Sequence, residues 1–261
     1  MTTDHFTVRR ADTAIQVSRG GHGRPLVFCP GLTSTQTELR ELLDLLRRDF
    51  DVVSLDLRGH GFSPAARYDF GSFLDDFAAV MTAVGPLDSP VLAGHSYGAD
   101  LIVHYAAENP GAVGELIVID GANPIPAPFL TAADLPELRA VWQEQARWLE
   151  TTRGTGRQVL LTPQEILDLN VELDILRCGI DLDGPGILDR YRAIDCPIQL
   201  IMSTTMAGVE GRAARHNRLW RAGVERLVRE QPRVSVTWVD ATHALVLTHA
   251  AEIAGLIRRI R

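Results

Sequence analysis

The amino-acid sequence predicts an α/β protein with a mostly parallel, twisted sheet, and three observations lead to that fold class. Short apolar strand patterns alternate with amphipathic helical patterns along most of the 261 residues, as in βαβ units. Several strands are apolar throughout, which is typical of strands that helices cover on both faces. One strand, at 90–94, runs through Gly94-His-Ser-Tyr-Gly98 directly into a helical pattern. We therefore expect a ligand site beyond the carboxyl ends of the strands.

The N-terminal segment predicts an edge hairpin followed by a buried strand. Residues 5–10 and 13–19 alternate apolar and polar side chains, which favours two paired strands at a sheet edge. Residues 20–25 are rich in glycine and predict a turn. Residues 26–29 are wholly apolar, as expected of a strand inside a parallel sheet.

Helical and strand patterns then alternate as far as Asp120. Leucines recur between residues 39 and 46 at spacings of three and four, and residues 71–84 form a second amphipathic helical pattern. Buried strands are expected at 52–55, 90–94 and 116–119. Ser96 and Asp120 both follow the carboxyl ends of such strands, so we expect them at the same edge of the sheet.

The pattern changes between residues 122 and 194. Helical patterns cover 131–152, 162–175 and 184–193, with no convincing strand between them. Long insertions usually carry function, so we predict a helical lid at 122–194 on an α/β core made of residues 1–121 and 195–261. The alternative is that these helices only pack on the sheet. Trp142 and Trp148 are candidate substrate-binding residues of the lid, although most such residues belong to a core.

Composition excludes several classes of function. The formal charge of −7 disfavours nucleic acid as a partner, and all 26 basic residues are arginine, which excludes lysine Schiff-base chemistry and a Ser–Lys dyad. The three cysteines are far apart, and no metal-binding spacing or cofactor motif occurs. The chain has no apolar run long enough to cross a membrane and no signal-peptide pattern at its start. We expect a cytoplasmic protein that acts on a small molecule without a metal or cofactor; its oligomeric state stays open.

The stretch around Ser96 predicts a nucleophile. Strand, abrupt turn and helix form the context of a Gly-x-Ser-x-Gly elbow, which exposes the serine hydroxyl at the tip of the turn. A serine needs a base within hydrogen-bond reach. Strands are expected at 198–202 and 234–239 and helices at 209–230 and 246–260, so His243 lies in the loop after the last strand. Among the eight histidines it is therefore the best candidate for the base.

These motifs resemble the α/β-hydrolase superfamily, in its compact lidded branch of bacterial esterase- and thioesterase-like enzymes. The matching segments are Pro30-Gly31-Leu32, Asp56-Leu-Arg-Gly-His-Gly-Phe-Ser63, Gly94-His-Ser-Tyr-Gly98 and Ala241-Thr-His243. The resemblance implies an oxyanion hole made by the backbone N–H groups of Leu32 and Tyr97. Gly31 and His95 are expected beside the substrate. Pro30 departs from the family's usual histidine, and His60, in the second segment, is interpreted as structural.

The sequence offers more than one candidate position for the acid that orients His243. Most of the family places it after the strand that follows the lid, where this chain has Ser203-Thr-Thr-Met206 and no carboxylate before Glu210. Residues 116–120 resemble the strand that ends in the acid of polyketide and peptide synthetase thioesterase domains. We therefore expect Asp120 to be the acid, with Glu210 or no acid at all as alternatives.

The sequence thus favours a serine hydrolase or acyl transferase that acts on an ester, thioester or lactone of a small apolar molecule. Ser96, His243 and Asp120 would form its triad and carry an acyl-enzyme. The alternative is a cofactor-free, non-hydrolytic enzyme on the same fold, in which the histidine and acid abstract a proton and the serine only binds. Elimination, cyclisation or oxygenation in secondary metabolism would follow.

Overall fold

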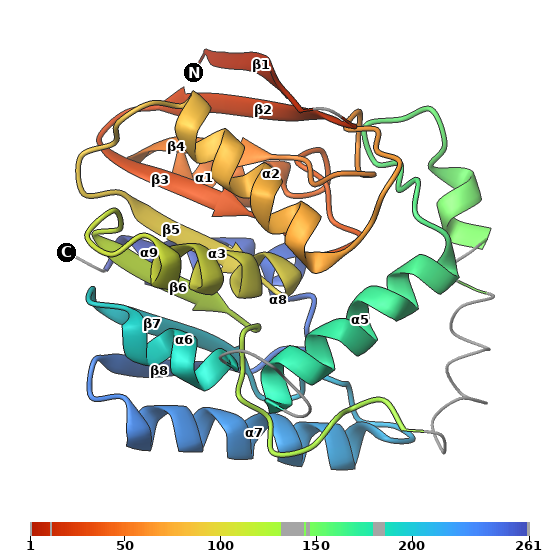
Figure 1. Ribbon diagram of the computed structural model, residues 1–261, viewed down its shortest axis with the longest axis vertical. Coiled ribbons are helices and arrows are strands. Elements are labelled where there is room, and N and C mark those ends of the chain that lie inside the picture. Colours follow the sequence, from red (N-terminus) through yellow and green to blue (C-terminus); the bar gives the residue numbers. More distant parts are fainter. Residues whose placement is uncertain (1, 11, 132–143, 145–146, 180–185, 260–261) are drawn as a thin grey trace.

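The structure, a computed structural model, describes residues 2–10, 12–131, 144, 147–179 and 186–259. Within these residues the strands form one eight-stranded sheet in the order β1-β2-β4-β3-β5-β6-β7-β8 (Figure 1). The strands are β1 (Thr3–Arg9), β2 (Ala14–Gly21), β3 (Arg24–Cys29), β4 (Phe50–Leu55), β5 (Val91–His95), β6 (Glu115–Ile119), β7 (Ile198–Ser203) and β8 (Val234–Val239). Every neighbouring pair from β4 to β8 is parallel, so the predicted α/β fold class is confirmed.

The N-terminal hairpin forms the antiparallel edge of this sheet. Among the described strands β1 pairs with β2 alone, and β2 also pairs antiparallel with β4, in a register that sets Val17 opposite Leu55. The alternation at the start of β2 follows from this position, because Ile15 and Val17 are buried in the core while Ala14 and Gln16 are half-buried. By contrast, β5 and β6 lie in the middle of the sheet and are buried at every position.

Helices cover both faces of the sheet (Figure 1). They are α1 (Arg40–Leu46), α2 (Phe70–Ala83), α3 (Tyr97–Glu108), α5 (Pro163–Cys178), α6 (Ile187–Ala193), α7 (Ala213–Glu230), α8 (Leu245–Thr248) and α9 (Ala250–Arg258). Buried residues of α2, α3, α5, α6 and α7 join one apolar core. Those of α1, α8 and α9 join a second core on the opposite face. The parallel strands are therefore shielded from solvent on both sides, as their apolar sequences require.

Two C-terminal helices differ from their predicted bounds. α7 begins at Ala213 rather than near residue 209, because Gly208 and Gly211 have φ values of 79° and 54°, outside the right-handed helical region. The side chain of Asn217 bonds the backbone of residues 207 and 208 and holds this turn. The last helix is divided into α8 and α9 at His249, whose φ of −127° interrupts the helix.

The inserted segment is fastened to the core by α5 and α6. α5 starts at a capping box formed by Thr162 and Glu165. Near its end, Arg177 makes a buried two-bond ion pair with Asp100 of α3, with distances of 3.0 and 2.6 Å. α6 packs on α3, and α5 packs on α2 and α6. Most of the predicted helix at 131–152 and the start of the one at 184–193 lie outside the described residues, so the lid stays a prediction.

Candidate active site

The turn after β5 holds Ser96 in a strained conformation. Its φ and ψ are 53° and −119°, a region that costs a non-glycine residue about 1–3 kcal/mol. Glycines allow the neighbouring backbone to close in around it. A Cβ on Gly98 would lie 2.3 Å from the carbonyl oxygen of Cys29, and one on Gly121 would lie 2.3 Å from the carbonyl oxygen of Ser96. The strand–turn–helix geometry of an elbow is therefore present, and it presents the Ser96 hydroxyl at the sheet edge.

Ser96, His243 and Asp120 form one hydrogen-bonded series. The Ser96 hydroxyl lies 2.8 Å from Nε2 of His243, and Nδ1 of His243 lies 2.8 Å from Oδ2 of Asp120. A carboxylate only accepts, so Nδ1 carries the proton that it donates to Asp120, and Nε2 accepts from the serine. The chain order Ser, Asp, His is therefore closed by contacts that span more than a hundred residues.

Asp120 is fully buried and accepts four hydrogen bonds. Besides His243, its donors are the N–H of Ser203 at 3.0 Å, the hydroxyl of Ser203 at 2.7 Å and Nε1 of Trp220 at 2.9 Å. Burial raises the pKa of Asp120, but the hydrogen bond and charge of His243 and the bonds from Ser203 outweigh it and leave the pKa below its ordinary value. The carboxyl group is thus held ionised without contact with solvent.

Ser203 and Trp220 were not among the residues singled out in the sequence. Ser203 ends β7, the strand after the insertion, where the resemblance usually places the acid itself. In this chain the position holds two donors that bind the carboxylate of the neighbouring strand. The absence of a carboxylate there was the available signal. The sequence carried no signal for Trp220, because Trp220 and Asp120 are 100 residues apart in the chain and meet only in the folded protein.

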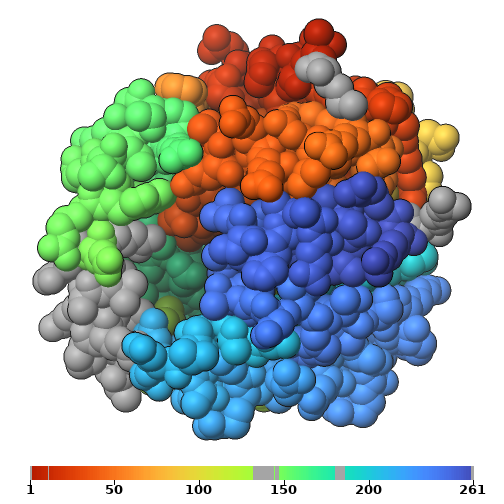
Figure 2. Space-filling view, turned by 180° about the vertical axis from the view of Figure 1, so that it is seen from behind, coloured from red at the N-terminus to blue at the C-terminus, as the bar shows by residue number. Residues whose placement is uncertain are grey.

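A cavity of about 450 Å³ opens above Ser96. Its described lining is apolar or carries hydroxyl and imidazole groups, with no carboxylate or guanidinium: Leu32, Thr33, Ser34, His95, Ser96, Met206, Ala207, Gly208, Thr242, His243, Ala244, Val246 and Leu247. Figure 2 shows a hollow on this side of the molecule, between the blue C-terminal helices and the lighter blue segment that precedes α7. A neutral organic molecule fits these surroundings better than a charged one.

The residues expected to supply backbone donors to an oxyanion lie next to Ser96. Gly31 lies so close that a Cβ there would be 3.0 Å from the Cβ of Ser96. The next residue, Leu32, lines the cavity. Tyr97 is the first residue of α3, so its N–H has no acceptor within the helix. Across the described residues neither this N–H nor that of Leu32 donates to another protein group, which leaves both available to an oxyanion.

His95 is hydrogen-bonded to the backbone of His243. Its Nε2 donates to the backbone carbonyl of His243 over 2.9 Å, which leaves Nδ1 as a buried acceptor without a partner among the described groups. Burial, and then the nearby charge of His243, lower the pKa of His95 to about 3, so the ring is neutral near pH 7. His95 also lines the cavity, and its contact with substrate stays a prediction.

Three further predicted residues are not among the described residues that line the cavity at Ser96. Trp142 is outside the described residues. Trp148 is 38% exposed and is not among the described residues that line the cavity at Ser96, so its contact with substrate stays a prediction. Glu210, the alternative acid, is exposed, and the carboxylate bonded to His243 is that of Asp120.

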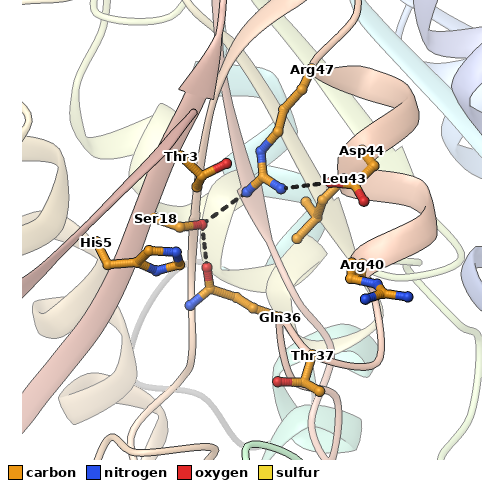
Figure 3. Close-up of a pocket in the computed structure, with 9 residues that line it drawn as sticks. All are labelled: Thr3, His5, Ser18, Gln36, Thr37, Arg40, Leu43, Asp44 and Arg47. Atoms are coloured by element: carbon orange, nitrogen blue, oxygen red, sulfur yellow. Dashed lines mark hydrogen bonds and ion pairs between the residues drawn. The ribbon is translucent and has the colours of Figure 1, made fainter. Parts of the chain in front are cut away.

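A second cavity, of about 310 Å³, lies between the N-terminal hairpin and α1 and shares no lining residue with the first. Figure 3 shows Arg47, at the end of α1, bonded to Ser18 of β2 at 3.0 Å and to Asp44 of α1 at 3.1 Å. The bond to Ser18 fastens the end of α1 to β2. No described group of His, Cys, Asp and Glu side chains could hold a metal ion. None of the described helices has the length and apolar character needed to cross a membrane.

Known proteins resemble this chain in both sequence and fold. The 2-(acetamidomethylene)succinate hydrolase of Mesorhizobium japonicum is 32% identical over 125 residues, which are 46% of this chain and 45% of that protein. The N-formylmaleamate deformylase of Pseudomonas putida is 35% identical over 104 residues, 39% of this chain and 38% of that protein. The chain therefore matches less than half the length of these curated relatives.

The fold likeness covers nearly the whole chain. A crystal structure of E-2-(acetamidomethylene)succinate hydrolase aligns with a TM-score of 0.67 and 19% identity, over 99% of this chain and 98% of that chain. A family model described as the alpha/beta hydrolase family matches residues 26–256. The match includes the elbow, the carboxylate at the end of β6 and the loop after β8. This chain is therefore a member of the alpha/beta hydrolase family.

Proposed function

We propose that this protein is a serine hydrolase that forms an acyl-enzyme at Ser96. The observation that carries the proposal is the hydrogen-bonded series of Ser96, His243 and Asp120 at the floor of a neutral cavity. A serine hydroxyl that donates to an imidazole is set up to lose its proton as it attacks a carbonyl carbon. The hydrolases among the relatives support the same class of reaction.

In this mechanism His243 takes the proton of Ser96 while Oγ bonds to the carbonyl carbon of the substrate. The N–H groups of Leu32 and Tyr97 bind the resulting oxyanion, and each such donor is typically worth about 3 kcal/mol of transition-state stabilisation. Asp120 stabilises the imidazolium. His243 then gives the proton to the leaving group as its bond to the acyl carbon breaks. Water, or an alcohol in acyl transfer, releases the acyl group by the same steps.

We propose a neutral ester, thioester or lactone as the substrate. The described walls of the cavity offer no cation to bind a carboxylate and no anion to bind an amine. Transfer of an unpaired charge into such surroundings is costly, whereas an apolar acyl group gains from burial. The succinate and maleamate named for the two relatives carry carboxylates, so we expect this chain to differ from them in substrate.

A fluorophosphonate tests the proposal directly, because serine hydrolases displace its fluoride and keep the phosphonate on Oγ. We expect one adduct per wild-type chain, mapped to Ser96 by peptide mass spectrometry. Ser96→Ala should give no adduct and should lose turnover of a neutral p-nitrophenyl ester. An unmodified wild-type protein would overturn the proposal. Turnover of a substrate that survives Ser96→Ala but is lost in His243→Ala would favour the non-hydrolytic alternative.

A further inference from the structure

The loop after β4 carries a buried histidine, His60, that contacts the turn beside the candidate oxyanion donors. His60 is inaccessible to solvent, and its Nε2 lies 2.9 Å from the backbone nitrogen of Thr33. Its Nδ1 lies 2.9 Å from the carbonyl oxygen of Arg58. The N–H of Thr33 can only donate and the carbonyl can only accept, so the ring carries its proton on Nδ1 and is neutral. Burial favours the same state, because it lowers the pKa of His60 to about 4.

The residue that His60 holds has an unusual backbone conformation. Thr33 has a φ of 68°, in the left-handed region that β-branched residues rarely adopt. The turn around it is closed by a bond from the N–H of Ser34 to the carbonyl of Gly31, at 3.1 Å. The bond from Thr33 to His60 ties this turn to the loop after β4. Leu32, which lines the cavity, lies between Gly31 and Thr33 in this turn.

We propose that His60 is a positioning residue that fixes the oxyanion turn at residues 31–34, so that the N–H of Leu32 points at the reacting carbonyl. This inference rests on the proposed hydrolase function. A displaced donor stabilises the oxyanion less, because that stabilisation depends on donors that are already in place when charge develops. His60 itself touches neither the substrate nor the reacting atoms.

His60 is in turn fixed by the inserted segment. The N–H of Gly61 donates to the carbonyl of Gln158 at 2.8 Å, and the N–H of Leu160 donates to the carbonyl of Gly59 at 2.7 Å. The side-chain amide of Gln158 donates to the carbonyl of Gly61 at 2.7 Å. Gly59 allows this close pairing, since a Cβ there would lie 2.4 Å from Leu161. The loop that carries His60 is therefore hydrogen-bonded to the inserted segment, and the imidazole of His60 is hydrogen-bonded to the turn at residues 31–34.

Substitution of His60 by glutamine or by asparagine removes one of its two side-chain hydrogen bonds at a time. In His60→Gln the side-chain oxygen can take the place of Nε2 and accept from Thr33. In His60→Asn the side chain is too short to reach Thr33, but its NH₂ can still donate to the carbonyl of Arg58. We expect kcat to fall about 10- to 100-fold in His60→Asn, less than the 10²- to 10³-fold typical of a lost donor. KM should change little, and His60→Gln should recover most of kcat.

Ser63→Ala is the matched control, because Ser63 is buried in the same loop and bonds Gln16 and Asp56 instead of the oxyanion turn. Hydrogen exchange of a peptide covering residues 30–35 gives a readout independent of activity. Exchange should quicken in His60→Asn and stay slow in His60→Gln and Ser63→Ala. If His60→Asn does not fold, ¹⁵N NMR of the wild type still reports whether Nε2 is the unprotonated acceptor.

Three results would overturn the inference: an Nε2-protonated His60, unchanged kcat in a folded His60→Asn protein, or equal losses in His60→Asn and Ser63→Ala. Failure of the proposed function looks different. In that case the wild type forms no fluorophosphonate adduct. Hydrogen exchange of residues 30–35 and the tautomer of His60 still report whether the bond from Thr33 to His60 is present.

Discussion

Replacement of Ser203 by alanine tests how strongly the buried carboxylate of Asp120 depends on its donors. The change removes the hydroxyl that binds Oδ2 at 2.7 Å and keeps the backbone N–H, so three of the four bonds remain. Hydrogen bonds to charged groups contribute about 1.5–3 kcal/mol each. Because Asp120 is fully buried, water cannot replace the lost donor. For a chain of this size, each kcal/mol lowers Tm by about 2–4 °C.

The same variant has a defined pH dependence. In the native protein the pKa of Asp120 is below its ordinary value, so its ionised form stabilises the fold above the unfolded-state pKa of about 3.9. That contribution is lost as pH falls through the lower, folded-state pKa. Loss of the Ser203 hydroxyl raises the folded-state pKa. Ser203→Ala should therefore lose stability at neutral pH, and the difference from wild type should shrink as pH falls through this range.

Thermal unfolding followed by circular dichroism between pH 3 and 8 measures both effects. Ser54→Ala is the control, since Ser54 is buried on β4 and its hydroxyl has no partner among the described groups. We expect a clear loss of Tm for Ser203→Ala and little change for Ser54→Ala. Equal losses in the two variants, or a Ser203→Ala difference that does not depend on pH, would refute the role assigned to this bond.

Three further predictions concern the acid, the ion pair and the elbow. Asp120→Asn should lower kcat by about 10⁴-fold, as in other serine triads, and unchanged kcat in steady-state assays would exclude it as the acid. Arg177→Met leaves the Asp100 carboxylate buried and unpaired, so urea unfolding should show a loss of about 3–5 kcal/mol; a loss below 1 kcal/mol would contradict this. Gly98→Ala should fail to accumulate as folded protein. Gly255→Ala, where a Cβ meets nothing within 4 Å, should instead raise the free energy of unfolding in urea by about 0.5–1 kcal/mol. Similar behaviour of both alanine variants would count against a close approach at the elbow.

The fold could be predicted from the sequence because its signals are local. Apolar runs at residues 26–29 and 116–119 and alternation at 13–19 reflect burial on two faces or one, and the structure places β3, β6 and β2 there. Errors occurred at helix ends. Gly208 and Gly211 delay the start of α7, and the effect of such glycines depends on the turn in which they lie.

The candidate site was only partly predictable, because only some of its signals are local in the sequence. Ser96 has a local signature, and strand order then brings His243 to the same sheet edge. The choice between Asp120 and Glu210 could not be made by counting residues. It depends on which carboxylate lies within hydrogen-bond reach of His243, and that contact joins positions 123 residues apart.

The succession of strands and helices along the chain, the serine at the elbow and the sheet edge where its partners are expected all follow from local sequence, because hydrophobic period and turn residues act over a few positions. The bonds from Ser203 and Trp220 to the carboxylate of Asp120, and from Thr33 to His60, are visible only in the folded chain. Hydrogen bonds act over about 3 Å in space. Whether two side chains come that close is set by the packing of whole strands and helices, which leaves no periodic trace in the sequence.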